Sequence, residues 1–211
     1  ATTLIVNRPV LVVGTTNLHK VREYKGMLRS RGDIDIYSLR DFPDYTPQPE
    51  EGDSFEAIAI QKAVDAASRL GATVLADDSG LIVPALGGDP GILSNRYAGI
   101  GASDKENREK LIAALRTLPE EERTGYFTCV IALATPQGLE KAVTAHVEGR
   151  LVVEPRGGQG FGYDPLFIKY DYSKTYAQLD EETKNRISHR RKALDKIFPT
   201  LETLLDRARH H

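Results

Sequence analysis

The sequence has one cysteine, no long hydrophobic run and almost no excess of either charge. Cys129 is the single cysteine among 211 residues, so no intrachain disulfide can form and a reducing cytoplasm is the expected location. The longest apolar stretches, 10–13 and 129–134, are far too short to cross a bilayer. A formal net charge of −2 argues against a nucleic-acid polymer as partner, so an anionic ligand needs a local cluster of positive groups.

What remains is the composition of an ordinary globular protein. Hydrophobic residues make up 40% of the chain and charged residues 27%, and the length allows a real core. The sequence shows no internal repeat, low-complexity tract or linker. We therefore expect a single domain over residues 1–209, with two lobes. Residues 210 and 211 are both histidine and resemble the start of an expression tag, so no function is assigned to them.

Hydrophobic patterning predicts an α/β fold with a mixed sheet and an extended hairpin. Strands are expected at 10–13, 34–37, 73–76, 81–83, 125–135 and 139–147. Helices are expected after Asn17 as N-cap, over 53–70, over 103–118 from a capping box, near 180, and from 188 with a break at Pro199.

Two adjacent carboxylates, Asp77 and Asp78, stand where the apolar run 73–76 stops, before a predicted turn at Ser79 and Gly80. Ligands in open α/β sheets gather at the carboxyl ends of strands. Two anionic groups side by side repel each other unless a cation or a proton intervenes, and Mg²⁺ prefers oxygen ligands. The alternative is a capped turn in which each aspartate accepts a backbone N–H.

Positive groups near the first turn suit a phosphate. Thr15, Thr16 and Asn17 precede a helix, whose N-terminus offers unpaired N–H groups and a positive dipole end. Lys20 adds a full charge in the first helical turn. Because the Gly-x-x-x-x-Gly-Lys-Ser/Thr pattern of a Walker A loop is absent, an N-cap beside a solvated lysine is the alternative.

Charged residues around the second predicted helix have two interpretations. Glu50 and Glu51 precede it, where acidic residues are common for dipole reasons alone. They matter only if the fold brings them to Asp77 and Asp78. Lys62 lies within the apolar stripe of the helix, so it either extends to solvent or reaches into a polar cleft.

Two later segments favour a flat anionic ligand. Four glycines among residues 157–162 allow close backbone approach, and Phe161 or Tyr163 could stack on a base. The alternative places these aromatic rings in the core. A cationic run at 184–192 is most often a solvated helix face, yet positive charge at a helix N-terminus is unfavourable without an anion to meet it.

Together these segments resemble the inosine triphosphate pyrophosphatase family, hydrolases of non-standard purine nucleoside triphosphates. The matching segments occur in the family's order and span nearly the whole chain: 15–20, 50–55 with 62–63, 76–80, 86–91, 160–165 and 188–190. The resemblance implies an elongated, twisted α/β sheet, a central cleft between two lobes, Mg²⁺ dependence and a homodimer. It also implies hydrolysis of ITP, dITP or XTP to the monophosphate and pyrophosphate.

The resemblance assigns roles position by position. Asp78 is similar to the general base and metal-associated carboxylate, with Asp77 in support. Glu50 is similar to the acidic metal site, and Lys62 to the buried basic residue at the phosphates. The implied substrate-binding positions are Thr15, Thr16, Asn17, Lys20, Ser79, Phe161, Gly162, Tyr163, Asp164 and Lys184, with His189 and Arg190 as the base-reading pair.

Two departures from the family's pattern affect these assignments. The usual first turn is Thr-Gly-Asn, whereas this chain has Thr16 in place of the glycine. Many members also place the metal glutamate three residues before Gly52, where this chain has Pro49. Glu50 therefore fits only with a one-residue gap, and Glu51 is the alternative ligand.

The implied chemistry predicts how the charges act. Mg²⁺ held by Glu50 and the two aspartates positions a water, Asp78 accepts its proton, and Lys62 keeps Asp78 ionised by lowering its pKa. Arg190 and a protonated His189, both donors only, match the 6-keto acceptor of hypoxanthine and xanthine. The alternatives are a pyrophosphatase of pyrimidine or modified triphosphates, a nucleotide-binding regulator without hydrolysis, and a structural domain with coincidental motifs.

Overall fold

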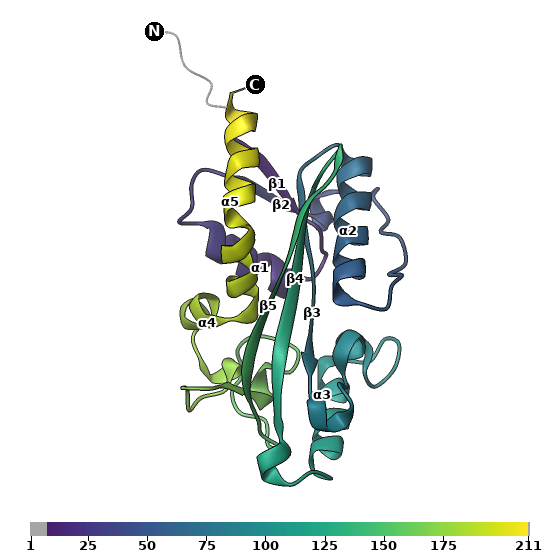
Figure 1. Ribbon diagram of the computed structural model, residues 1–211, viewed down its shortest axis with the longest axis vertical. Coiled ribbons are helices and arrows are strands. Elements are labelled where there is room, and N and C mark those ends of the chain that lie inside the picture. Colours follow the sequence, from purple (N-terminus) through teal and green to yellow (C-terminus); the bar gives the residue numbers. More distant parts are fainter. Residues whose placement is uncertain (1–7, 211) are drawn as a thin grey trace.

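The computed structural model describes residues 8–210 and forms one mixed sheet with the strand order β2-β1-β3-β4-β5-β6 (Figure 1). The strands are β1 Val10–Val13, β2 Asp35–Ser38, β3 Val74–Ile82, β4 Thr124–Thr135, β5 Gly138–Leu151 and β6 Phe167–Lys169. The α-helices are α1 Leu18–Leu28, α2 Phe55–Leu70, α3 Asp104–Leu115, α4 Glu181–Ile187 and α5 His189–Arg209. β1 pairs in parallel with β2 and β3, and the other strand pairs are antiparallel, which confirms the predicted fold class.

Side chains that the sequence predicted as caps begin these helices. The Asn17 side chain accepts the N–H groups of His19 at 3.0 Å and Lys20 at 3.3 Å, so it is the N-cap of α1. Ser103 and Glu106 form the predicted capping box of α3. These local bonds fix the residue at which each of the two helices begins.

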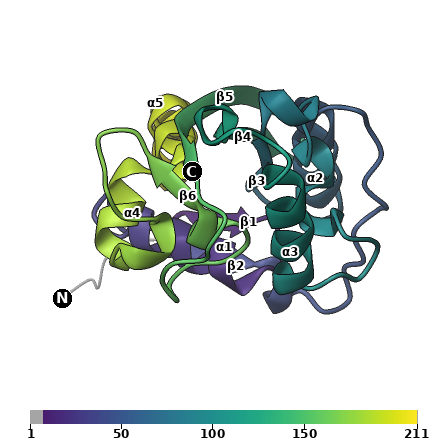
Figure 2. The same cartoon turned by 90° about the horizontal axis from the view of Figure 1, so that it is seen from below.

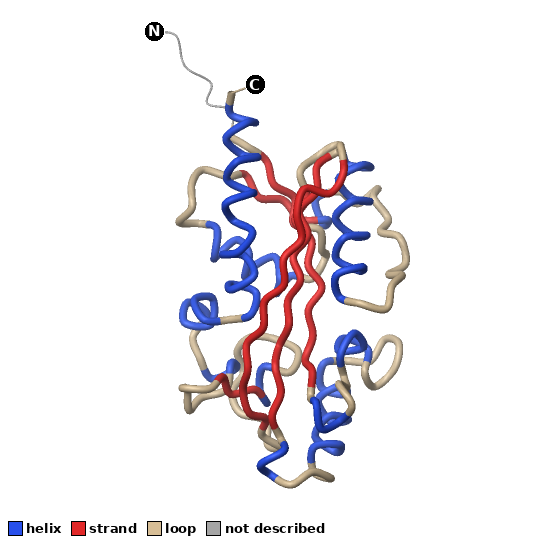
Figure 3. The backbone as a smooth tube through the Cα atoms, viewed as in Figure 1, coloured by secondary structure: helices blue, strands red, loops and turns tan. Residues whose placement is uncertain are grey.

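The sheet is shared by two lobes, and its long strands join them (Figure 3). In one lobe, α1 and α5 cover one face of the sheet and α2 covers the other, with an apolar cluster on each side. In the other lobe, α3, β6 and the ends of β3, β4 and β5 enclose a third cluster. Figure 2 shows that the sheet is strongly curled, which confirms the predicted elongated, twisted, two-lobed arrangement.

The predicted turn at Ser79 and Gly80 is wrong, because β3 continues through both residues. β4 pairs with β3 along its whole length, from Val74 to Ile82, and so supplies hydrogen-bond partners past the two aspartates. Gly80 serves close packing instead of a turn, because a Cβ there would lie 2.6 Å from the carbonyl oxygen of Gly91. The separate strand predicted at 81–83 is the end of β3.

The predicted helix break at Pro199 is also wrong, since α5 is continuous from His189 to Arg209. Pro199 lies on the exposed face of the helix, four residues after the exposed Asp195. The carbonyl group that loses its N–H partner there can bond to water, which makes the proline tolerable.

The ends and the helices of the described chain add two facts. Within residues 8–210, no helix is both long and apolar enough to span a membrane. His210 follows directly after α5, whereas His211 lies outside the described residues, so the tag interpretation stays a prediction.

Candidate active site

A cavity of about 410 Å³ opens between the two lobes. Its walls come from the turn after β1, the start of α1, α2, β3, α3 and the loop before β6. The predicted site residues that line it are Thr15, Thr16, Asn17, Lys20, Glu50, Lys62, Asp78, Ser79, Phe161, Gly162, Tyr163, Asp164, Lys184, His189 and Arg190. Residues far apart in the sequence thus meet in one cleft, with Asp77 buried beside them.

The cleft forms where β1 ends and β3 continues. β1 pairs with β3 only at Val12 with Val74 and at Val13 with Leu75. Beyond that point the β1 side of β3 is open, and the turn that starts at Thr15 crosses it on the way to α1. The carboxyl end of β1 therefore meets the middle of β3, a topological position where α/β proteins bind ligands.

Asp77 is buried, with 4% of the residue exposed, and its carboxylate is fully engaged by neighbours. Lys20 Nζ donates to Oδ1 at 2.7 Å, while the Tyr24 hydroxyl at 2.5 Å and Arg190 Nε at 2.8 Å donate to Oδ2. Burial alone would raise its pKa, but the charges of Lys20, Arg190 and Lys62 outweigh burial and hold that pKa well below its usual range. Asp77 is therefore ionised and organises the cations around it.

Asp78 has the opposite surroundings. Its Oδ2 atom is buried and has no hydrogen-bond partner among the described residues. Burial, helped by the charges of Glu50 and Asp77, raises the pKa of the Asp78 carboxyl to about 7. Lys62 lowers this pKa, as expected, and so does Lys20, but burial outweighs both, so the expectation that Lys62 keeps Asp78 ionised is wrong. A carboxyl that titrates near neutral pH suits a general base.

Lys62 joins the two acidic positions of the cavity. Its Nζ donates to the backbone oxygen of Asp77 at 2.8 Å and lies 3.6 Å from Glu50 Oε1. Burial first, and then the nearby Lys20, lower the pKa of Lys62. Of the two alternatives left open by the sequence interpretation, reaching into a polar cleft describes this side chain.

The acidic residues fit a hard divalent cation only in part. Glu50 lines the cavity together with Asp78, whose Oδ2 has no partner within residues 8–210. The Asp77 carboxylate is already paired with Lys20 and Arg190, so it is not available to a metal ion. This corrects the expectation that both aspartates hold the metal. Across residues 8–210, no group of three or more His, Cys, Asp or Glu side chains is placed to hold a metal. Mg²⁺ accepts one or two protein carboxylates when phosphates and water complete its shell.

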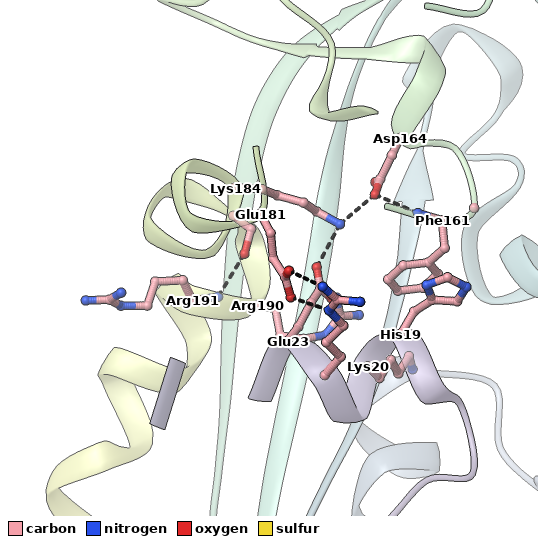
Figure 4. A network of polar contacts seen from close by, with 12 residues as sticks. His19, Lys20, Glu23, Phe161, Asp164, Glu181, Lys184, Arg190 and Arg191 are labelled. Carbon is pink, nitrogen blue, oxygen red and sulfur yellow. Dashed lines mark hydrogen bonds and ion pairs between the residues drawn. The ribbon is translucent and has the colours of Figure 1, made fainter. Parts of the chain in front are cut away.

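A second charged network continues from the first (Figure 4). Lys184 Nζ donates to Asp164 Oδ2 at 2.5 Å and pairs with Glu23 Oε1 at 2.7 Å. Arg190 Nη1 donates to Glu23 Oε2 at 2.7 Å, and Arg190 Nη2 donates to the Ser79 hydroxyl oxygen at 2.8 Å. Lys184 and Arg190 are buried, so the solvated-face alternative is wrong for these two members of the cationic run. The anions that balance their charge are carboxylates of the protein itself.

The two aromatic residues of the glycine-rich loop behave differently. The Phe161 ring borders the cavity and stacks on His19, with 5.1 Å between ring centroids and 14° between planes (Figure 4). Tyr163 is buried, and its hydroxyl donates to the backbone oxygen of Ser94 at 2.6 Å. The alternative of a ring turned into the core therefore holds for Tyr163.

His189 is neutral, in contrast to the protonated donor that the sequence interpretation assumed. Its ring stacks on Phe127, with centroids 4.5 Å apart. Burial, with the charges of Arg190 and Lys184, lowers the pKa of His189 well below its usual value. One ring nitrogen is then an acceptor, and the buried Nδ1 atom has no partner among the described residues.

Sequence reasoning missed several residues of the site. Glu23 and Tyr24 on α1 contact the predicted residues directly, and the other missed residues that line the cavity include Ser94, Asn95, Asp104, Asn107 and Phe127. Asp104 Oδ2 accepts the N–H of Gly162 at 2.9 Å, which ties α3 to the glycine-rich loop. The excess of positive charge at 184–192 could have predicted a carboxylate partner for these residues, although it does not point to Glu23 itself.

Comparisons with known proteins match this chain to one family. The model of the Ham1 family matches residues 11–200. The dITP/XTP pyrophosphatase of Protochlamydia amoebophila is 50% identical over 197 residues, which cover 93% of this chain and 99% of that protein. The protein of the same name from Chlamydia trachomatis serovar L2 is 47% identical, with 92% and 94% covered. Among solved structures, the Staphylococcus aureus Ham1 protein matches with a TM-score of 0.79 at 39% identity, covering 92% of this chain and 98% of that chain.

Proposed function

This chain belongs to the Ham1 family, and we propose that it hydrolyses the non-standard purine nucleoside triphosphates ITP, dITP and XTP to the monophosphate and pyrophosphate. Relatives at 47–50% identity that match over nearly their whole length carry the name dITP/XTP pyrophosphatase. The structural observation that carries the proposal is that one cleft holds both an Asp78 oxygen without a partner among the described residues and three lysines, Lys20, Lys62 and the buried Lys184. Such a cleft suits a triphosphate and a general base together.

In the proposed reaction, Asp78 accepts the proton of a water that attacks the α-phosphate. Its pKa of about 7 leaves a large ionised fraction at neutral pH, and its Oδ2 atom, which no described residue contacts by a hydrogen bond, can receive the proton. Lys20 and Lys184 hold the departing pyrophosphate, with the N-terminus of α1 beside them. Asp77 keeps Lys20 in place through the 2.7 Å ion pair.

We also propose that Glu50 and Asp78 hold Mg²⁺ together with the substrate phosphates. When bound, the ion would neutralise phosphate charge and position the water. Glu50 is preferred to Glu51 because Glu50 lines the cavity and lies 3.6 Å from Lys62.

Base selection in this proposal depends on N–H groups of Arg190 that make no hydrogen bond to the described residues. Arg190 has five N–H groups, and three of its nitrogens each donate one bond to Asp77, Glu23 or Ser79. The remaining donors suit the 6-keto oxygen of hypoxanthine or xanthine and oppose the 6-amino group of adenine. Phe161 offers its ring at the cavity wall for stacking.

The proposal is tested by incubating the protein with Mg²⁺ and ITP, XTP, GTP, ATP or dTTP separately and resolving the products by chromatography. Formation of IMP or XMP with pyrophosphate, with GTP and ATP largely spared, is the expected result. Turnover of dTTP instead would contradict the purine assignment. Tight binding of one nucleotide without hydrolysis of any would contradict the enzyme assignment and favour a regulator.

Four further expectations from the sequence stay predictions. These are the homodimer, the cytoplasmic location, the single domain over residues 1–209 and the absence of a nucleic-acid polymer as partner.

A further inference from the structure

The segment that carries Glu50 is attached to α2 by side chains of that helix. This segment, the Glu50 loop (residues 43–53), leads from the 3₁₀ turn Leu39–Asp41 to α2 without forming a helix or strand. The Tyr45 hydroxyl donates to Asp65 Oδ2 at 2.5 Å, and Arg69 Nη1 donates to the backbone oxygen of Thr46 at 2.8 Å. These two bonds attach the beginning of the loop.

Gln61 holds the loop at a different place, on both sides of Glu50. Its Nε2 donates to the backbone oxygen of Pro49 at 2.9 Å, and its Oε1 accepts the backbone N–H of Glu51 at 3.1 Å. A primary amide is the side chain that can donate and accept at one end in this way. Both peptide groups that flank Glu50 are therefore fixed by one residue, which restricts the direction of the Glu50 side chain.

The spacing along α2 explains how one helix does this. Gln61, Asp65 and Arg69 are four residues apart, so they lie on one face of the helix and meet the loop in succession. Lys62 follows Gln61 directly and reaches the cavity, where its Nζ lies 3.6 Å from Glu50 Oε1. The same turn of α2 thus positions both the Lys62 ammonium group and the Glu50 carboxylate.

We propose that Gln61 is a positioning residue, which fixes Glu50 for the divalent cation of the reaction proposed above. This inference rests on the proposed function. Because Tyr45 and Arg69 attach the rest of the loop independently, loss of the Gln61 bonds should free Glu50 without detaching the loop. The expected effect is weaker metal binding with little change in the chemical step, as for other residues that orient metal ligands.

The test compares Gln61→Leu, which keeps the bulk and removes both bonds, with the control Tyr45→Phe, which removes a loop bond distant from Glu50. Hydrogen exchange of the Glu51 amide in metal-free protein, Mn²⁺ affinity by electron paramagnetic resonance, and the Mg²⁺ dependence of ITP hydrolysis are measured. We expect faster Glu51 exchange, about tenfold weaker Mn²⁺ binding and an equal rise in the Mg²⁺ midpoint for Gln61→Leu. Saturating Mg²⁺ should restore kcat, and Tyr45→Phe should match wild type in all three.

Two results would overturn the inference. One is an unchanged Mn²⁺ affinity and Mg²⁺ midpoint in Gln61→Leu. The other is a loss of kcat that saturating Mg²⁺ does not restore, since this indicates a general structural role. If wild-type protein hydrolyses no triphosphate, the proposed function fails, whereas Glu51 exchange and Mn²⁺ affinity still decide whether Gln61 positions Glu50.

Discussion

Asp77 and Asp78 are consecutive residues of β3, and their carboxylates meet opposite electrostatic surroundings. Successive side chains of a strand point to opposite faces of a sheet. Asp77 pairs with Lys20 of α1 and Arg190 of α5, whereas Asp78 Oδ2 has no partner in the described part of the chain. The pKa of Asp77 is held well below its usual range, and that of Asp78 is raised to about 7. Two carboxyls whose pKa values are pushed apart in this way are suited to different roles.

The two carboxyls should titrate separately in metal-free protein. We expect the ¹³C carboxyl signal of Asp78 to titrate with a pKa of about 7, because burial disfavours its charged form. The Asp77 signal should stay that of a carboxylate from about pH 4 to about pH 9, because its cationic neighbours favour the charge. The measurement is NMR of selectively labelled protein, with Asp78→Asn for assignment. An Asp78 pKa near the ordinary value of about 4 would contradict the description.

The raised pKa of Asp78 also predicts how stability depends on pH. A group whose pKa is higher in the folded state favours folding at low pH, and this contribution is lost as the pH rises through about 7. The Asp78→Asn variant lacks this titration. Relative to wild type, its free energy of unfolding, measured by urea denaturation, should therefore rise from about pH 5 to about pH 8 and stay level above that, because Asp78 is then ionised in both states. A constant difference across this range would show that Asp78 is already ionised at pH 5.

Tyr24 should contribute to stability through its bond to Asp77. The hydroxyl is fully buried and donates to the charged Oδ2 at 2.5 Å, so Tyr24→Phe removes one donor from a buried carboxylate. We expect the free energy of unfolding to fall by about 1.5–3 kcal/mol, measured by urea denaturation. Tyr170→Phe is the matched control, because Tyr170 is exposed and should change stability by less than about 0.5 kcal/mol. Equal effects in the two variants would show that the Asp77 bond contributes nothing measurable.

The preference for ITP over ATP should not depend on the protonation of His189. Burial keeps this ring neutral, so its hydrogen-bonding character is constant between about pH 5.5 and about pH 8. The ratio of the two kcat/KM values is the right measure, because Asp78 serves both substrates and its titration cancels. We expect a constant ratio. A ratio that declines as the pH rises through about 6.5 would show that a histidinium reads the base.

Local features of the fold could be predicted because neighbouring residues decide them. Asn17 caps α1 and Ser103 opens α3 through bonds within three residues, and the strand run at 10–13 is apolar on its own. The grouping of the candidate site residues in one cleft could also be predicted, because polar groups at the end of β1 and on β3 lie close together in such a sheet.

The features that could not be predicted depend on distant partners. Ser79 and Gly80 favour a turn locally, but they lie within a strand because β4 pairs along the whole of β3. Glu23 has no distinctive local pattern, and its role depends on Lys184 and Arg190, more than 150 residues later. Likewise, the neutrality of His189 follows from burial, which a sequence pattern does not report.

The most direct test of the account is the turnover of ITP by wild type and by Asp78→Asn, with Mg²⁺ present and IMP and pyrophosphate resolved by chromatography. Asparagine keeps the size of the side chain but cannot accept a proton from water. We predict that wild type forms IMP and pyrophosphate and that Asp78→Asn is slower by at least about 100-fold, while it remains folded and binds ITP. A folded Asp78→Asn variant with wild-type turnover would contradict the role assigned to Asp78.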